Sequence, residues 1–247
     1  MTHVREQTPV PAFTSNGHKT AGKLPGRRVF VMLGAPGAGK GTQADLLSAK
    51  LSLPHISSGE MFRTAQRTGT PVGLEASRYL ERGALVPDEL TIQLIGDRLA
   101  QPDAHDGVIL DGFPRTRPQA EALDQMLAAQ GTRVTGALYV EVDRDELVRR
   151  LSGRRVCTSP VQHNYHDVFA RPRVPGICDI DGTPLVQRPD DRPETVLARM
   201  EKQLPPMYEV VDYYADKGVL CAVRGDLPID KVTEELLHAV DTACQVR

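Results

Sequence analysis

The chain has 247 residues, of which 40% are hydrophobic, so it is long enough for one domain or for one domain with an inserted lobe. The 30 Lys and Arg residues nearly balance the 32 Asp and Glu residues, and aromatic residues make up only 4%. This balance gives no reason to expect a nucleic-acid partner, and no apolar run reaches the roughly 20 residues of a membrane span.

The first 28 residues differ from the rest of the chain. They contain several Pro and Gly residues, an excess of basic residues and no periodic apolar pattern. This composition favours a disordered tail before a domain at 29–247, in a protein of the cytoplasm, where the four Cys residues would stay reduced. The alternative is a mitochondrial transit peptide, because the segment is basic and carries hydroxyl groups, although it is not amphipathic.

From residue 29 onward, short apolar runs alternate with helical patterns. The runs predict strands at 29–33, 108–110, 137–140 and 219–223, and a charged helix is expected from Asp145 to Arg155. This alternation predicts an α/β fold with a parallel central sheet and helices on both faces. The interval 156–187 is rich in Pro and Gly without a helical period, which favours a small functional lobe or lid.

A Gly-rich segment, Gly-Ala-Pro-Gly-Ala-Gly-Lys-Gly-Thr at 34–42, follows the first predicted strand and opens a helix. Its glycines allow backbone N–H groups to surround an anion, and a lysine there would reach the β and γ phosphates of a nucleotide. The hydroxyl that binds Mg²⁺ normally follows the lysine directly, whereas here Gly41 intervenes before Thr42. The alternative to a phosphate-binding loop is a Gly-rich turn that only connects the strand to the helix. The context favours a phosphate site made of Gly37, Ala38, Gly39, Lys40, Gly41 and Thr42.

Five motifs in order resemble adenylate kinases of the long-lid type, within the nucleoside-monophosphate kinases. They span roughly residues 29–240 and comprise the phosphate loop, Ile56-Ser-Ser-Gly-Glu-Met-Phe-Arg63, Leu110-Asp-Gly-Phe-Pro-Arg-Thr116, Gly153-Arg-Arg155, and Arg188-Pro-Asp-Asp191 followed by Arg199. The resemblance implies a three-layer P-loop fold with a helical AMP-binding flap at 57–86 and a lid at 156–187. It also implies reversible, Mg²⁺-dependent phosphoryl transfer from ATP to AMP, giving two ADP.

The resemblance assigns most phosphate contacts to arginines, whose guanidinium groups bind phosphate oxygens in pairs. Arg150 would pack on the donor base, and Arg154 would join it on ATP. The catalytic set would be Lys40, Arg115, Arg154, Arg188 and Arg199. AMP would be bound by Ser58, Arg63, Leu85, Val86, Gly112, Arg115, Gln119, Arg188 and Arg199. For any one arginine taken alone, a solvated surface position is the alternative.

Asp111 ends an apolar run, where a carboxylate can orient the water molecules around Mg²⁺ while Thr42 supplies a hydroxyl. A helix N-cap is the alternative for this aspartate. No residue of the set needs to be a nucleophile or general base, since positioning and electrostatic stabilisation would carry the catalysis.

The lid segment carries part of a zinc motif. Cys157, Cys178 and Asp181 match three of the four ligands found in one group of relatives, but Pro160 stands at the remaining position and cannot ligate a metal. His163 could substitute at a nonstandard spacing. The sequence therefore favours a metal-free lid held by packing and hydrogen bonds, with zinc and a Cys157–Cys178 disulfide as alternatives.

Three other functions compete with ATP-dependent phosphorylation of AMP. A uridylate or cytidylate kinase would carry a much shorter lid, and the sequence does not separate ATP from GTP as the donor. A non-catalytic nucleotide-binding module would need no second set of phosphate-binding arginines. We expect a monomer, because no heptad or long apolar stripe demands a partner.

Overall fold

The computed structural model describes residues 26–159 and 161–245. Residues 1–25, on which the predicted tail and transit peptide fall, lie outside the described residues. The folded part begins slightly earlier than predicted, because Arg28 already belongs to strand β1. The Arg27 and Arg28 side chains donate hydrogen bonds to the backbone carbonyls of Leu99 and Leu51, at 3.1 and 3.2 Å.

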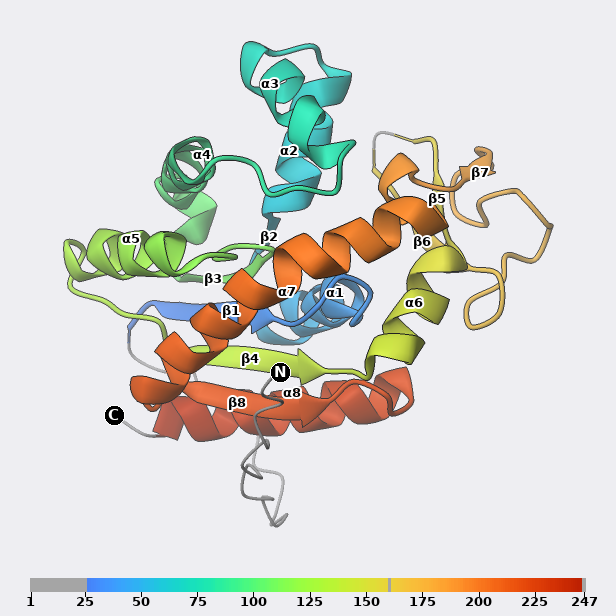
Figure 1. The fold of residues 1–247 in the computed structure, drawn as a ribbon. Helices are drawn as coiled ribbons and strands as arrows, with labels where there is room; N and C mark the ends of the chain where they lie inside the picture. Colours follow the sequence, from blue (N-terminus) through green and yellow to red (C-terminus); the bar gives the residue numbers. More distant parts are fainter. Residues whose placement is uncertain (1–25, 160, 246–247) are drawn as a thin grey trace, which may run out of the picture.

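A five-stranded sheet, in which all neighbouring strands are parallel, forms the centre of the molecule (Figure 1). The predicted α/β fold with a parallel sheet is therefore confirmed. One strand, β2, was not predicted, since three residues are too few for a periodic pattern. The strands lie in the order β2 (His55–Ser57), β3 (Gly107–Asp111), β1 (Arg28–Leu33), β4 (Gly136–Glu141) and β8 (Leu220–Arg224).

Successive residues of β1 point to opposite faces of the sheet, as the period of a strand requires. Phe30 and Met32 pack in one core cluster with residues of α1 and α8, whereas Val29, Val31 and Leu33 pack in a second cluster with residues of α4, α5 and the end of α7. These helices are α1 (Lys40–Leu51), α4 (Asp88–Leu99), α5 (Arg117–Ala128), α7 (Pro193–Asp216) and α8 (Ile229–Gln245).

Helix α6 (Arg144–Ser152) ends earlier than the prediction of a helix reaching Arg155. Gly153 follows it, and Arg154 and Arg155 already lie in strand β5 (Arg154–Cys157). Strand pairing explains the difference, because Arg154 lies opposite His166 and Arg155 opposite Tyr165 in an antiparallel ladder. Backbone groups that pair between strands cannot continue the preceding helix.

Two lobes project from the sheet on the same side of the molecule (Figure 1). The flap holds α2 (Ser58–Arg67) and α3 (Pro71–Leu80), and Phe62, Ala76 and Val86 form a small core of its own. The lid holds a three-stranded antiparallel sheet, with β5 between β6 (Asn164–His166) and β7 (Leu185–Val186). Short 3₁₀ turns span Pro102–Ala104 and Pro189–Asp191.

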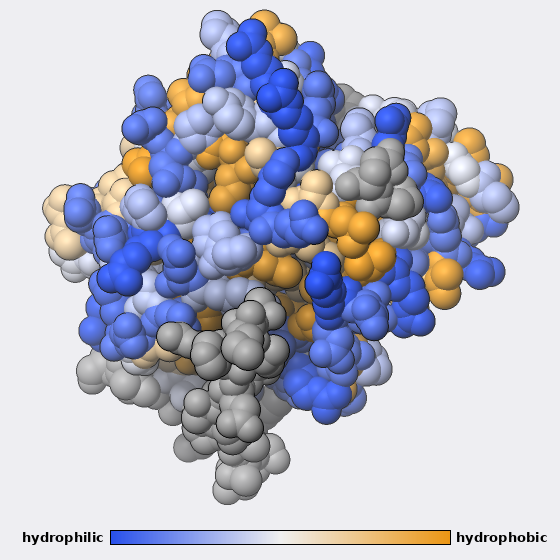
Figure 2. All heavy atoms as spheres, viewed as in Figure 1, coloured by the Kyte–Doolittle hydropathy of each residue, from blue (hydrophilic) through white to orange (hydrophobic). Residues whose placement is uncertain are grey.

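The surface is polar over most of the face in view. Figure 2 shows hydrophilic residues across the flap, the lid and the space between them, with hydrophobic residues in scattered groups. Among the described residues, no helix combines the length and apolar character needed to cross a membrane.

Candidate active site

A large cavity of about 1410 Å³ lies at the carboxyl ends of β1 and β3 and extends toward the flap and the lid. Ligand sites of parallel α/β sheets occur at this edge. Most of the predicted phosphate ligands line it, namely Gly37, Ala38, Gly39, Lys40, Gly41, Thr42, Arg63, Asp111, Gly112, Arg115, Arg150, Arg154, Arg188 and Arg199. The lining does not include Ser58, Leu85, Val86 and Gln119, which the structure also describes.

The loop between β1 and α1 has the conformation that its glycines allow. Gly34 has a φ of +141°, and a Cβ there would lie 2.6 Å from the carbonyl oxygen of Val140, so no larger residue fits. Gly39 also has a positive φ, of +93°, where the loop enters α1. Backbone N–H groups at the start of α1 therefore face the cavity and favour an anion there.

Lys40 lies inside this loop. Its Nζ donates hydrogen bonds to the carbonyl oxygens of Gly34 and Ala35, both at 2.8 Å. Burial lowers the pKa of Lys40 to about 8, and the neighbouring charge of Arg115 adds to the effect of burial. A buried cation of this kind is stabilised when an anion enters the cavity.

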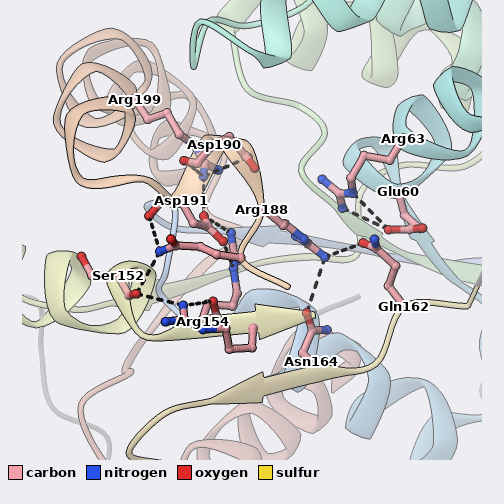
Figure 3. Close-up of polar contacts among 12 residues, drawn as sticks. Glu60, Arg63, Ser152, Arg154, Gln162, Asn164, Arg188, Asp190, Asp191 and Arg199 are labelled. Carbon is pink, nitrogen blue, oxygen red and sulfur yellow. Dashed lines mark hydrogen bonds and ion pairs between the residues drawn. The ribbon is translucent and has the colours of Figure 1, made fainter. Parts of the chain in front are cut away.

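Asp191 joins two of the predicted catalytic arginines (Figure 3). Its carboxylate has no exposed surface and accepts two hydrogen bonds from Arg154, from Nε at 2.6 Å and from Nη2 at 2.5 Å. The same carboxylate accepts a third bond from Arg199 Nη1 at 3.1 Å, and Asp190 lies 3.0 Å from that nitrogen. The two guanidinium groups are therefore fixed beside each other before any ligand binds.

Arg188 extends from the start of the α7 region toward the lid (Figure 3). Its Nη2 donates to the side-chain oxygens of Gln162 and Asn164, at 3.1 and 3.5 Å, while its buried Nε has no partner. Burial lowers the pKa of Arg188 to about 9, and repulsion from Arg63 and Arg154 lowers it further. The group has unused hydrogen-bonding capacity in a strongly positive environment.

Arg115 and Arg63 converge on the first turn of α2. A Cβ at Gly59 would lie 3.3 Å from Arg63 Nη1 and 3.7 Å from Arg115 Nη2. Arg63 is paired with Glu60 through two bonds, at 3.1 and 3.2 Å, as Figure 3 shows. Burial lowers the pKa of Arg115 to about 10, and the charge of Arg199 contributes to this. Two cations close to a helix N-terminus favour an anion there, at a place apart from the phosphate loop.

Two side chains that were predicted to contact AMP, Gln119 and Ser58, make hydrogen bonds to other groups of the protein. The Gln119 side chain is buried, donates to Asp88 Oδ1 at 2.7 Å and accepts from the backbone N–H of Arg115 at 2.8 Å. The Ser58 hydroxyl is buried and donates to the Gly112 carbonyl at 2.6 Å. Both side chains thus brace the segment that carries Arg115.

Asp111 supplies the carboxylate at the end of β3. Burial opposes its ionisation, but the neighbouring His55, whose Nε2 lies 3.7 Å from Asp111 Oδ2, and the charge of Lys40 outweigh burial and lower the pKa of Asp111 to about 2. A Cβ at Gly41 would lie 3.5 Å from Asp111 Oδ2, so the carboxylate lies beside the first turn of α1 that carries Thr42. Carboxylate and hydroxyl oxygens are suited to Mg²⁺ and to its bound water.

Comparison with known proteins agrees with this geometry. Residues 32–219 match the family model described as adenylate kinase. The chain is 48% identical to an adenylate kinase of Lysinibacillus sphaericus over 207 residues, which cover 84% of this chain and 95% of that protein. It is 46% identical to one of Acetivibrio thermocellus over 211 residues, which cover 85% and 97%. The chain belongs to the adenylate kinase family.

An adenylate kinase of Staphylococcus aureus gives a similar result, with 44% identity over 212 residues that cover 86% of this chain and 98% of the relative. The match extends over the phosphate loop, the flap and the lid. The predicted membership in the adenylate kinases is therefore confirmed, and with it the activity class of a nucleotide-binding phosphotransferase.

The lid of this adenylate kinase brings four metal-binding side chains together. The ligand atoms of Cys157, His163, Cys178 and Asp181 all lie within 4.8 Å of one another. His163 reaches the cluster because β5 and β6 form a hairpin, in which the backbone N–H of Cys157 bonds to the His163 carbonyl at 3.1 Å. His163 thus lies beside Cys157, Cys178 and Asp181, and four side chains that could ligate a metal meet in the lid.

Three residues of the site were not identified from the sequence. Asp191 was quoted within a motif without a role, and neither His55 nor Gln203 was considered. His55 lies between Asp45 Oδ1, at 2.7 Å from Nδ1, and Asp111 Oδ2, at 3.7 Å from Nε2. The available signal for His55 was its place directly before the Ile56-Ser-Ser motif, where it begins strand β2.

Proposed function

We propose that the protein transfers the terminal phosphoryl group of ATP to AMP reversibly, giving two ADP. The observation that carries this proposal is the convergence of partly buried cations on one cavity. Lys40, Arg115 and Arg188 all have pKa values lowered first by burial and then by their neighbours' charges. Such a cluster fits a ligand with several negative charges, as two nucleotides held end to end supply.

The two ends of the cavity support separate roles. The phosphate loop, with Lys40, is suited to the donor triphosphate, and Arg150 lies on α6 at the same end, held by Glu146 at 2.8 Å. Arg63 and Arg115 at the start of α2 are suited to the acceptor monophosphate. The pair Arg154 and Arg199, with Arg188, would surround the phosphoryl group in transit and stabilise the charge that develops there.

The reaction in this proposal uses Mg²⁺, and Thr42 and Asp111 are the residues that would hold the ion, in part through water. Mg²⁺ would neutralise phosphate charge and orient the donor. The residues present fit the ion, because both offer oxygen atoms and Asp111 is ionised at neutral pH. The flap and the lid, which both border the cavity, would exclude water from the reacting groups.

A non-catalytic module that only binds nucleotide is the competing function. Binding alone needs one phosphate site, whereas the cations that line this cavity form two groups, at the phosphate loop and at the start of α2, with further arginines between them. GTP is the competing donor in place of ATP. We propose a monomer, because the sequence has no heptad pattern or long apolar stripe that demands a partner.

Replacing one arginine at each end tests the assignment of the two sites. Arg115→Lys should raise the KM for AMP about tenfold or more and change the KM for ATP little, because a lysine cannot bind phosphate bidentately. Arg150→Met should raise the KM for ATP about tenfold or more and change the KM for AMP little. Steady-state kinetics with each nucleotide varied in turn measures both constants. Parallel increases of both KM values in each variant would show that the ends are not specialised.

We also propose that the lid binds a structural zinc ion. Tetrahedral bonds of about 2.0–2.3 Å place neighbouring ligand atoms roughly 3.3–3.8 Å apart. Nδ1 of His163 lies 3.5 Å from Cys157 Sγ, 3.4 Å from Cys178 Sγ and 3.1 Å from Asp181 Oδ2. Cys157 Sγ lies 3.6 Å from the same Asp181 oxygen. The other Asp181 oxygen accepts two bonds from Thr183, which orients the carboxylate toward the cluster.

Zinc content and stability measure this second proposal without an activity assay. The purified protein should hold about one zinc ion per chain, and its removal by a chelator should lower the unfolding temperature by at least about 5 °C. His163→Ala should lose the ion, whereas His238→Ala, on the exposed side of α8, should keep it. Full zinc content in His163→Ala, or clearly sub-stoichiometric zinc in the unaltered protein, would contradict the proposal.

A further inference from the structure

Gln203 is a buried polar residue that the proposed reaction has not used. It lies on α7, is 8% exposed and lines the cavity. Its Nε2 donates to the carbonyl oxygen of Gly83 at 2.8 Å, and its Oε1 accepts from Arg115 Nη1 at 3.3 Å. One side chain therefore joins the C-terminal end of the flap to Arg115, which follows β3 and lies beside the N-terminus of α2.

The bond to Arg115 restricts the direction of the guanidinium group. Arg115 Nε donates to the Gly112 carbonyl at 2.7 Å, and Gln203 takes one hydrogen of Nη1. The remaining nitrogen, Nη2, lies on the side of Gly59, at the start of α2. The two carbonyl acceptors thus leave Nη2 for an anion at the helix N-terminus.

The bond to Gly83 fixes the place where the flap ends. Gly83 has a φ of +64°, and a Cβ there would lie 2.5 Å from Arg199 Cγ, so α7 and this turn are in close contact. Leu85 and Val86, the predicted contacts of AMP, follow two and three residues later. Lys202, next to Gln203, donates to the Arg82 carbonyl at 3.2 Å from the exposed side of the helix.

We propose that Gln203 is a positioning residue of the acceptor site. It holds the Arg115 guanidinium toward the acceptor phosphate and ties it to the end of the flap that receives the rest of AMP. Its removal weakens binding of the acceptor and leaves binding of the donor intact, because Lys40 and Arg150 make no contact with it in the structure's described residues. The inference rests on the proposed placement of AMP at Arg63 and Arg115.

The test replaces Gln203 by Met, which has a similar size, and by Asn, which keeps the amide but is too short to span both partners. Each variant should raise the KM for AMP roughly tenfold, with less than about a twofold change in the KM for ATP. Lys202→Met is the matched control, since it removes a bond to the neighbouring carbonyl without touching Arg115, and its KM for AMP should stay unchanged. A KM for AMP near that of the unaltered enzyme in both Gln203 variants would overturn the inference.

A second comparison separates this inference from the function it rests on. In an Arg115→Lys background, Gln203→Met should add less than about twofold to the KM for AMP, because its partner is already lost. A full, independent tenfold effect would show that Gln203 acts by another route and would overturn the inference. If Arg115→Lys alone leaves the KM for AMP unchanged, the placement of AMP fails, and the inference fails with it.

Discussion

Lys40→Met is expected to lower kcat by at least about 10³-fold while the protein stays folded. The Lys40 Nζ is held by two carbonyls of the phosphate loop at 2.8 Å, beside the N-terminus of α1. In the proposed reaction the Lys40 ammonium group would stabilise the charge on the phosphoryl oxygens, which Met cannot do. Because the transition state carries more charge there than the bound nucleotides do, kcat falls more than nucleotide affinity.

The same substitution has an unusual expected effect on stability. Burial and the neighbouring arginines lower the pKa of Lys40, so in the absence of nucleotide its charge is not favourable. Lys40→Met should therefore leave the unfolding temperature unchanged or raise it. Lys50→Met, on the exposed end of the same helix, is the matched control and should behave as the unaltered enzyme. A kcat within tenfold of the unaltered enzyme would remove Lys40 from its role.

Asp191→Asn should have the second largest effect. The Asp191 carboxylate is completely buried and holds Arg154 and Arg199 together. An amide keeps the shape but removes the carboxylate that pairs with Arg154 and one of the two carboxylates that pair with Arg199, and one of its two acceptor positions becomes a donor. We expect a loss of roughly 3 kcal/mol in unfolding free energy and a fall in kcat of about 10²-fold.

Chemical denaturation and steady-state kinetics measure both effects of Asp191→Asn. The matched control is Asp103→Asn, because Asp103 also receives two bonds from one arginine, Arg98, but on the exposed surface. That control should leave both properties nearly unchanged, since water screens an exposed pair. Equal losses of unfolding free energy and of kcat in Asp191→Asn and Asp103→Asn would contradict the prediction, because they would show that burial of the Asp191 carboxylate does not increase its effect.

The sequence predicted those parts of the site that depend on short, local patterns. The phosphate loop could be recognised because its glycines, Lys40 and Thr42 lie within nine residues, between a buried strand and a helix. The arginines were predicted from a resemblance that spans the chain, and those that face the cavity come from α2, α6, β5, α7 and the loops after β3 and β7.

Bridging side chains could not be predicted in the same way. Gln203 joins Arg115 and Gly83, which are 88 and 120 residues away along the chain, and no local pattern marks a buried amide on a helix. His163 reaches Cys157 only through the turn of a hairpin, so its spacing in the sequence differs from that of a simple ligand pair. Three-residue β2 was missed because alternation needs more residues than it has.

The most direct test is an assay of phosphoryl transfer with Mg²⁺ that crosses ATP, GTP and CTP as donors with AMP, GMP, CMP and UMP as acceptors. We expect rapid transfer from ATP to AMP, formation of ATP and AMP when ADP is the only nucleotide supplied, and loss of both reactions when Mg²⁺ is chelated. A preference for GTP would correct the donor. Nucleotide binding without transfer to any acceptor would contradict the account and leave a binding module in its place.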